Sequence, residues 1–146
     1  MKMISILNEE LNTKPAEIKV TRNVPASWEA SFKINDLNYY FFATKIGDND
    51  YDIEFGTKEK GTESTNIGKN VDKVFSTVLA CIKQFVKDRN PDEIYFVTMG
   101  KDNKRKVIYS KFLNKINKHL PNYEKIDNME NKTFLKTTTA FAIKRK

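Results

Sequence analysis

The segment Asn66–Leu120 constrains the fold more than any other part of the chain. Within it, apolar residues recur at steps of three and four residues from Val71 to Val86. This spacing predicts a long amphipathic helix, which Asn70 caps and which ends at Arg89 before Asn-Pro. An apolar stripe of this width is stable only when it packs against another apolar surface, so the chain must also supply a sheet or further helices.

Two elements follow this helix with few residues between them. Ile94–Val97 is a short, continuous apolar run, which is typical of a central strand. A second amphipathic helix is predicted from Asp102, as its N-cap, to about His119. A buried strand between two amphipathic helices indicates one sheet whose surface carries both helices.

The remaining elements complete an α+β order. Met3–Asn12 has helical spacing and is predicted as a short helix, and Asp36-Leu37-Asn38 is predicted as a turn. Period-two alternation predicts strands at Ile18–Val20, Trp28–Ile34 and Tyr51–Phe55. The strand predicted at Asn38–Thr44 is aromatic on both faces and is therefore expected to lie centrally in the sheet. Two further strands are predicted at Tyr123–Asp127 and Thr133–Ile143. The expected fold is α+β, with a mainly antiparallel twisted sheet of about six or seven strands packed by two long helices and the short N-terminal one. At 146 residues the chain has the length of one domain, so residues 1–146 are predicted to form a single domain.

Three carboxylates in and beside the predicted strand Tyr51–Phe55 are candidate functional groups. Asp50, Asp52 and Glu54 alternate with apolar residues and therefore share one face. The pattern is typical of the solvated face of an edge strand, and the alternative is a site for a hard cation. Other reactive residues are scarce: Cys81 is expected in the core, and the cation of His119 at a helix C-terminus would complement the helix dipole. With one cysteine and one histidine, no zinc site is expected, and we predict no metal site.

Charge and composition narrow the class of partner. Lys and Arg number 26 against 19 Asp and Glu, which gives a net charge of +7. This excess favours nucleic acid or an acidic protein as partner, although a merely lysine-rich soluble surface has the same composition. The single cysteine suits a reducing compartment, and no apolar stretch is long enough to span a membrane. We therefore expect no membrane association and a location in the cytoplasm or in a virion interior.

The second helix carries the clearest candidate binding surface. Four lysines fall within about 60° on a helical wheel, roughly opposite the apolar face, and two more basic residues lie near the helix start. Cations at a helix N-terminus are unfavourable because they oppose the helix dipole. Together with the free N–H groups there, they favour the binding of an anion. The alternative interpretation is a solvated stripe of lysines with no ligand. Residues 144–146 form a basic tail that either extends this surface or is disordered. The predicted anion- or partner-binding residues are Lys101, Lys104, Arg105, Lys111, Lys115 and Lys118.

Two segments, together with the element order, resemble a known family. Thr65–Asn70, which contains Gly68, precedes the long helix, and Asn103–Phe112, which contains Tyr109, begins the basic helix. They resemble the Gcn5-related N-acetyltransferases, in which a strand, a loop and a long helix bind the cofactor pyrophosphate and two strands part to admit the acyl thioester. The resemblance implies acetyl-CoA held at Gly68 and Asn70, with Tyr109 as the acid for the leaving thiolate. Only Gly68 fits the family's loop pattern, so the cofactor loop is degenerate.

A second resemblance concerns the helix segment Val74–Val78 and the elements around it. This segment, together with the predicted sheet, is similar to small uncharacterised proteins of tailed bacteriophages. The resemblance includes the strand that is followed by a helix with Arg and Tyr. We therefore favour a non-enzymatic, phage-type accessory protein that uses no cofactor. Its basic helix would bind an acidic protein surface or a nucleic-acid backbone. The alternatives are an acetyl-CoA-dependent N-acyltransferase and a virion structural component that contacts packaged DNA.

Overall fold

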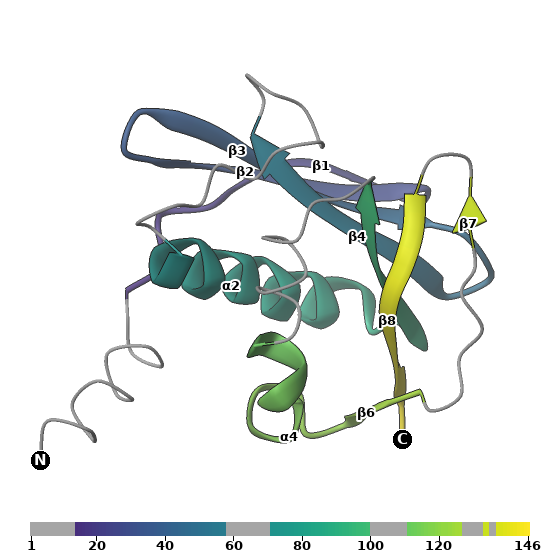
Figure 1. The fold of residues 1–146 in the computed structure, drawn as a ribbon. Coiled ribbons are helices and arrows are strands. Elements are labelled where there is room, and N and C mark those ends of the chain that lie inside the picture. The colour runs from purple at the N-terminus through teal and green to yellow at the C-terminus, as the bar shows by residue number, and fades with distance from the viewer. Residues whose placement is uncertain (1–13, 58–70, 100–110, 127–132, 135–136) are drawn as a thin grey trace, which may run out of the picture.

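Alternating apolar residues in the N-terminal half build a meander of four antiparallel strands (Figure 1). The computed structural model describes residues 14–57, 71–99, 111–126, 133–134 and 137–146. The strands are β1 (Lys19–Val24), β2 (Ser27–Ile34), β3 (Leu37–Lys45) and β4 (Asp50–Thr57). The turn between β2 and β3 is Asn35-Asp36, both with positive φ (47° and 65°), as a two-residue type I′ hairpin requires. The predicted turn was therefore one residue late, because Leu37 already pairs with Ile34.

The sheet continues from the meander into the C-terminal strands. The strand order is β1-β2-β3-β4-β5-β8-β6, where β5 spans Glu93–Met99, β6 spans Tyr123–Lys125 and β8 spans Thr137–Arg145. The short strand β7 (Thr133–Phe134) also pairs with β8. Among the described strands, β4 and β5 are parallel and the other pairings are antiparallel. The predicted fold class, an α+β fold with a mainly antiparallel sheet, is confirmed.

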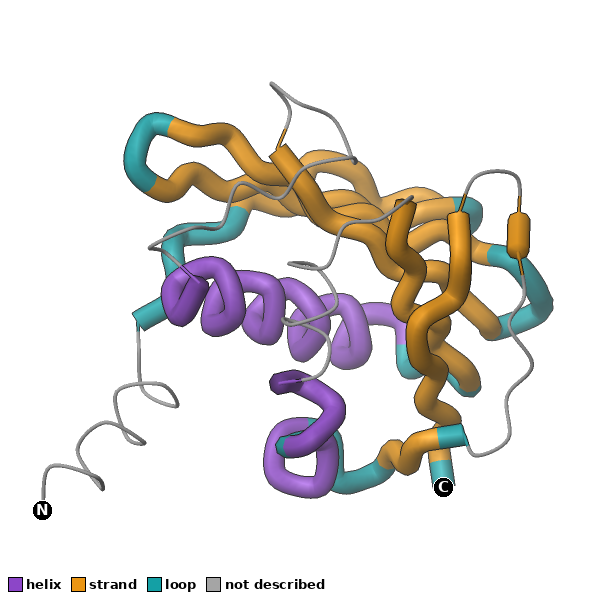
Figure 2. The backbone as a smooth tube through the Cα atoms, viewed as in Figure 1, coloured by secondary structure: helices purple, strands orange, loops and turns teal. Residues whose placement is uncertain are grey.

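The long helix α2 (Val71–Arg89) covers one face of the sheet, and its bounds match the prediction (Figures 1 and 2). Its apolar stripe meets the inward side chains of β2 to β5 in one buried cluster. Cys81 is fully buried there, and burial raises the pKa of its thiol to about 12, so it acts as a small apolar residue. In the described part of the chain, no helix has the length and apolarity needed to cross a membrane. The largest fully buried side chains of the cluster include Trp28, Tyr39, Phe41, Phe55, Phe75, Phe85, Phe96 and Phe112.

The second helix departs from its predicted form. Residues 111–114 are helical, but the chain turns at Lys115, and the short helix α4 (Ile116–His119) follows. The N–H of Lys115 bonds the carbonyl of Phe112 at 3.0 Å, a spacing of three residues instead of four. The predicted single helix to His119 is therefore interrupted at Lys115, so Lys111, Lys115 and Lys118 do not lie on one continuous helical stripe.

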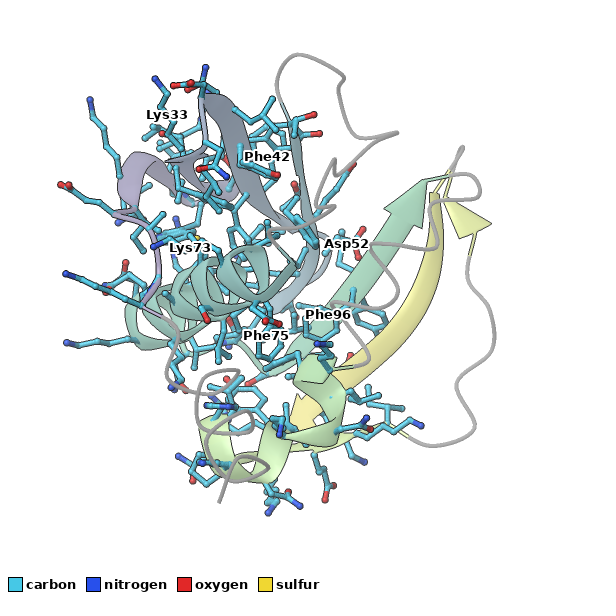
Figure 3. All side chains as sticks on the ribbon, turned by 60° about the vertical axis from the view of Figure 1, so that its left-hand side comes forward. Lys33, Phe42, Asp52, Lys73, Phe75 and Phe96 are labelled. Atoms are coloured by element: carbon cyan, nitrogen blue, oxygen red, sulfur yellow. The ribbon has the colours of Figure 1, made fainter. Side chains whose placement is uncertain are left out.

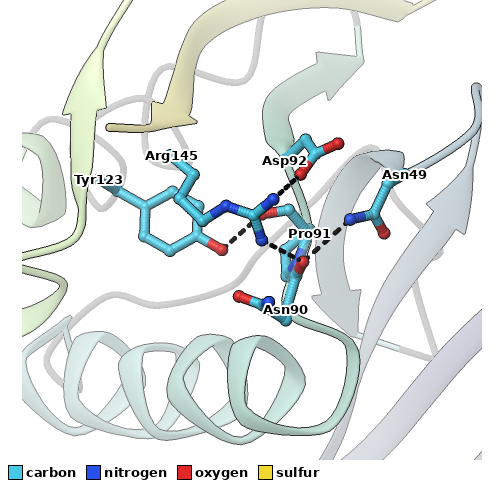
Figure 4. Close-up of polar contacts among 6 residues, drawn as sticks. All are labelled: Asn49, Asn90, Pro91, Asp92, Tyr123 and Arg145. Atoms are coloured by element: carbon cyan, nitrogen blue, oxygen red, sulfur yellow. Dashed lines mark hydrogen bonds and ion pairs between the residues drawn. The ribbon is translucent and has the colours of Figure 1, made fainter.

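The turn between α2 and β5 is held by side chains from distant parts of the chain (Figure 4). Its carbonyl at Asn90, a residue with φ of 46°, accepts from Asn49 Nδ2 and from Arg145 Nη1, both at 2.9 Å. Arg145 also pairs with Asp92, and the hydroxyl of Tyr123 donates to the carbonyl of Pro91. Arg145 is thus a strand residue with fixed partners.

The C-terminal residues do not form the predicted basic tail. Lys144 belongs to β8 and lies 3.9 Å from Glu124 of the neighbouring strand β6. The N–H of Lys146 donates to the carbonyl of Asn122 at 2.8 Å. Lys144 and Arg145 are therefore ordered residues of the sheet, and the backbone of Lys146 is bonded to the chain before β6.

The substitution Tyr123→Phe tests the contribution of this turn to stability. Removing the hydroxyl leaves the carbonyl of Pro91 without its donor, so we expect a loss of about 1 to 2 kcal/mol in the free energy of unfolding. Urea denaturation with an unchanged m-value would measure it. The exposed substitution Lys45→Gln serves as a control with no expected effect. An unchanged midpoint for Tyr123→Phe would show that the bond contributes nothing.

Candidate active site

The parallel strands β4 and β5 part in the middle of the sheet. They pair from Asp50 with Glu93 to Ile53 with Phe96, and their pairing then ends. Both strands continue: β4 stays paired with β3 as far as Thr57, and β5 stays paired with β8 as far as Met99. A register shift between β5 and β8 lies at this same point, after Phe96. The sheet therefore divides into two halves, and β5 and β8 lean away from the meander (Figure 3).

Carboxylates and a tyrosine lie on the face of β4 and β5 opposite to α2. Asp50, Asp52 and Glu54 share one face of β4, as predicted, because the residues between them are buried under α2. In the register, Asp50 is opposite Glu93 and Asp52 is opposite Tyr95. The interpretation of β4 as an edge strand was wrong, because β3 and β5 lie on either side of it. These side chains therefore line the point where the strands part.

Asp52 has the most perturbed carboxylate of this group. Burial, followed by the nearby charge of Glu54, raises the pKa of Asp52 from 3.8 to about 6. Its Oδ1 atom is buried, and no described residue forms a hydrogen bond with it. Burial and the acidic residues Glu93, Asp92 and Asp48 also raise the pKa of Asp50. A carboxylate with a pKa near 6 takes up and releases a proton close to neutral pH, as a general base must.

Tyr95 is held beside these carboxylates in its protonated form. Its hydroxyl donates to Glu93 Oε2 at 2.9 Å. Burial, this hydrogen bond and the negative charges of Glu93, Asp50 and Asp52 raise the pKa of Tyr95 to about 12. Tyr95 therefore contributes a neutral hydroxyl to the site. In the described residues no group of acidic, histidine or cysteine side chains has the arrangement of a metal site.

The described lysines of the predicted basic surface have different surroundings. Lys111 forms an ion pair with Asp72 of α2 at 3.7 Å, so its charge is partly used within the protein. Lys115 lies at the turn before α4, and Lys118 is exposed on α4. Gly68, Asn70, Lys101, Lys104, Arg105 and Tyr109 lie outside the described residues, as does the predicted helix Met3–Asn12.

His119 differs from its predicted role. Partial burial, together with the positive charges of Lys83, Lys118 and Lys115, lowers its pKa, so the neutral ring is favoured. The predicted cation at a helix C-terminus was therefore wrong. The helix α4 has only 4 residues, and the dipole of so short a helix does not outweigh burial and three lysines.

Sequence analysis missed Glu93 and Tyr95 as members of the site. Its signal for the carboxylates of β4 was period-two alternation, which is local. The pairing of β4 with β5 joins residues about 40 positions apart in the chain, across a helix, and alternation carries no information on that register. For these two residues, the local sign is an acidic residue and a tyrosine two positions apart at the start of the strand after the long helix.

Comparisons with known proteins add a likeness in fold. No protein-family model matches the chain, and no curated protein matches it in sequence. Among solved structures, the chain is similar to an acetyltransferase of Bacillus subtilis in complex with CoA, with 10% sequence identity and a TM-score of 0.49. The match covers 88% of this chain and 96% of that one. A likeness at this level says nothing of the chemistry of the site, and it does not bear on the resemblance to phage proteins.

Proposed function

We propose that the protein is an acyltransferase that admits an acyl thioester between β4 and β5 and uses Asp52 as the general base. The observation that carries this proposal is the parting of the two central parallel strands beyond Ile53 and Phe96. Interior strands of a sheet normally stay paired along their shared length, since each pairing satisfies main-chain groups. The separation of two central strands that both continue supports a binding site for an extended ligand at that point.

The parted strands suit an extended ligand that contains amides. The pantetheine arm of coenzyme A has two amide groups along a narrow chain, and main-chain groups of strands recognise such a chain as they recognise another strand. The arm would enter between Glu54–Thr57 of β4 and Val97–Met99 of β5. The resemblance to the acetyltransferase family implies the same route for the acyl thioester.

Asp52 lies where the reacting groups would meet. The acceptor is taken to be an amine, as the family resemblance implies. Its nitrogen forms a bond to the acyl carbon, the carbon–sulfur bond breaks, and the proton released by the amine passes to Asp52. With a pKa of about 6, Asp52 is mostly ionised at neutral pH and still basic enough to accept this proton. Tyr95 and Glu93 restrict the position of the acceptor by their hydrogen-bonded pair.

Acetyl-CoA would supply the activated acyl carbonyl. A fit of its pantetheine arm is supported by the parting of the strands beside the neutral hydroxyl of Tyr95 and the carboxylate of Asp52. The resemblance implies Gly68 and Asn70 at the pyrophosphate and Tyr109 as the acid for the thiolate, and these three residues remain predictions. The geometry favours this alternative over the non-enzymatic binding role. The reason is that the basic surface is interrupted at Lys115 and is partly neutralised by the pair between Lys111 and Asp72. Roles in a phage or virion also remain predictions.

Thermal unfolding with three ligands tests the proposal. We expect acetyl-CoA to stabilise the protein, by about 2.7 kcal/mol at 100 times its dissociation constant, which corresponds to about 8 °C in Tm. Pantetheine alone should also stabilise it, because it carries the part that enters between the strands. Adenosine 3′,5′-bisphosphate is the matched control that lacks this arm. If neither acetyl-CoA nor pantetheine shifts Tm at millimolar concentration, the acyltransferase proposal is wrong.

A further inference from the structure

A small cavity lies between α2 and α4. Its volume is about 160 Å³, and it is lined by Pro15, Phe75, Ser76, Leu79, Lys83 and His119, among others. An engineered cavity of about 150 Å³ in another protein admits benzene, so this space suits a ligand with one ring or a branched chain of similar size. The cavity belongs neither to the core cluster's filled interior nor to the face that carries Asp52.

The surroundings of the cavity are positively charged. Lys83 of α2 lines it and is exposed, while Lys118 of α4 and Lys115, which directly precedes α4, are close in the chain to the lining residue His119. Their charges act on the ring of His119, since all three lower its pKa. In the described part of the chain none of these three lysines forms an ion pair, in contrast to Lys111. The positive charge at the mouth of the cavity therefore lacks a counter-charge from the described residues.

The lining combines two chemical characters. Phe75 and Leu79 supply an apolar wall, and both are nearly fully buried. The Nε2 atom of His119 is also buried, without a hydrogen-bond partner in the parts of the chain that are described. An apolar wall below a cationic mouth is complementary to a molecule with an apolar body and one negative head group.

We propose that this cavity binds a small monocarboxylate, with its apolar part against Phe75 and Leu79 and its carboxylate at Lys83. The charge-assisted hydrogen bond to the ammonium group fixes the orientation, and burial of the apolar part supplies most of the affinity. A dicarboxylate suits the site less well, because a second charge would have to enter the apolar wall. The site is independent of the acyl-transfer site, so each proposal stands or fails by itself.

The single histidine of the chain provides a direct readout. Proton NMR of the His119 ring in the full-length protein follows a titration with benzoate as the probe. We expect a saturable change in the ring signals, and a rise in the pKa of His119 because the bound carboxylate offsets the lysine charges. Benzyl alcohol, which has the same ring and no charge, should bind at least tenfold more weakly.

Two variants of the same helix locate the carboxylate. Lys83→Gln removes the ammonium group at the mouth and should weaken benzoate binding about tenfold. Lys87→Gln removes the same charge one turn further along α2, from an exposed residue that does not line the cavity, and should leave the affinity nearly unchanged. The proposal is overturned by any of three results: ring signals that do not respond to benzoate, equal binding of benzyl alcohol, or equal losses in the two variants.

Discussion

Asp52→Asn is expected to lower acyl transfer by about 10²- to 10⁴-fold while it stabilises the folded protein above pH 7. The loss of activity rests on the proposed role of Asp52 as general base, since an amide cannot accept the proton. The gain in stability rests only on the raised pKa of Asp52, which is about 6 in the fold against 3.8 ordinarily. Opposite effects on activity and stability distinguish a functional carboxylate from a structural one.

The sign of the stability effect follows from proton linkage. Between pH 4 and pH 6 the folded protein holds more protons at Asp52 than the unfolded chain does, so the free energy of unfolding falls as pH rises through this window. Below pH 4 both states are protonated and the variant should match the wild type. Above pH 6 Asp52 is ionised in both states, and the loss in the free energy of unfolding is complete. A rise of about two units in the pKa of Asp52 corresponds to about 3 kcal/mol in the free energy of unfolding. Solvent screening of this partly exposed group reduces the stability that Asp52→Asn is expected to gain to about 1 kcal/mol.

Urea denaturation at pH 4 and at pH 8, together with the rate of acetyl transfer to a small amine, measures both effects. Glu17→Gln is the matched control: it removes a carboxylate from an exposed residue ahead of β1, and it should change neither quantity appreciably. A stability difference between Asp52→Asn and wild type that is the same at both pH values would contradict the raised pKa. Full activity of the variant would exclude Asp52 as the base.

Trp28→Ala should produce the largest loss of stability, about 3 to 5 kcal/mol. Trp28 is fully buried between sheet and helix. The centroid of its ring lies 5.8 Å from that of Phe41, which it meets edge-on, and 5.8 Å from that of Phe85 of α2. Removal of the ring therefore leaves a cavity where β2, β3 and α2 meet. The indole Nε1 also donates to Asp88 Oδ2 at 3.0 Å, which joins β2 to the last turn of α2.

Two comparisons separate packing from the hydrogen bond. Trp28→Phe keeps an aromatic ring and loses the donor, and it should cost about half as much as Trp28→Ala. Val20→Ala, at an exposed position of β1, should remain within about 0.5 kcal/mol of wild type. Denaturant midpoints of the three variants give the ranking. If Trp28→Ala costs no more than Val20→Ala, the buried cluster does not stabilise the fold as described.

Local sequence patterns accounted for the elements and for the faces they bury. The three- and four-residue spacing in Val71–Arg89 predicted the bounds of α2, and the aromatic residues of β3 predicted a central strand. Alternation also placed the carboxylates of β4 on one face. These patterns succeed because helix and strand periods depend on neighbouring residues, and burial of the apolar face is the largest favourable term for either element.

Tertiary structure alone decided which strands adjoin and what surrounds each charge. The insertion of β8 between β5 and β6, and the parting of β4 from β5, arise from pairings between distant residues. The same contacts bring Asp72 to Lys111, raise the pKa of Asp52 and keep His119 neutral. The spacing of apolar residues indicates which side chains are buried. Strand register, ion pairing and proton affinity depend instead on groups that come together only when the chain folds.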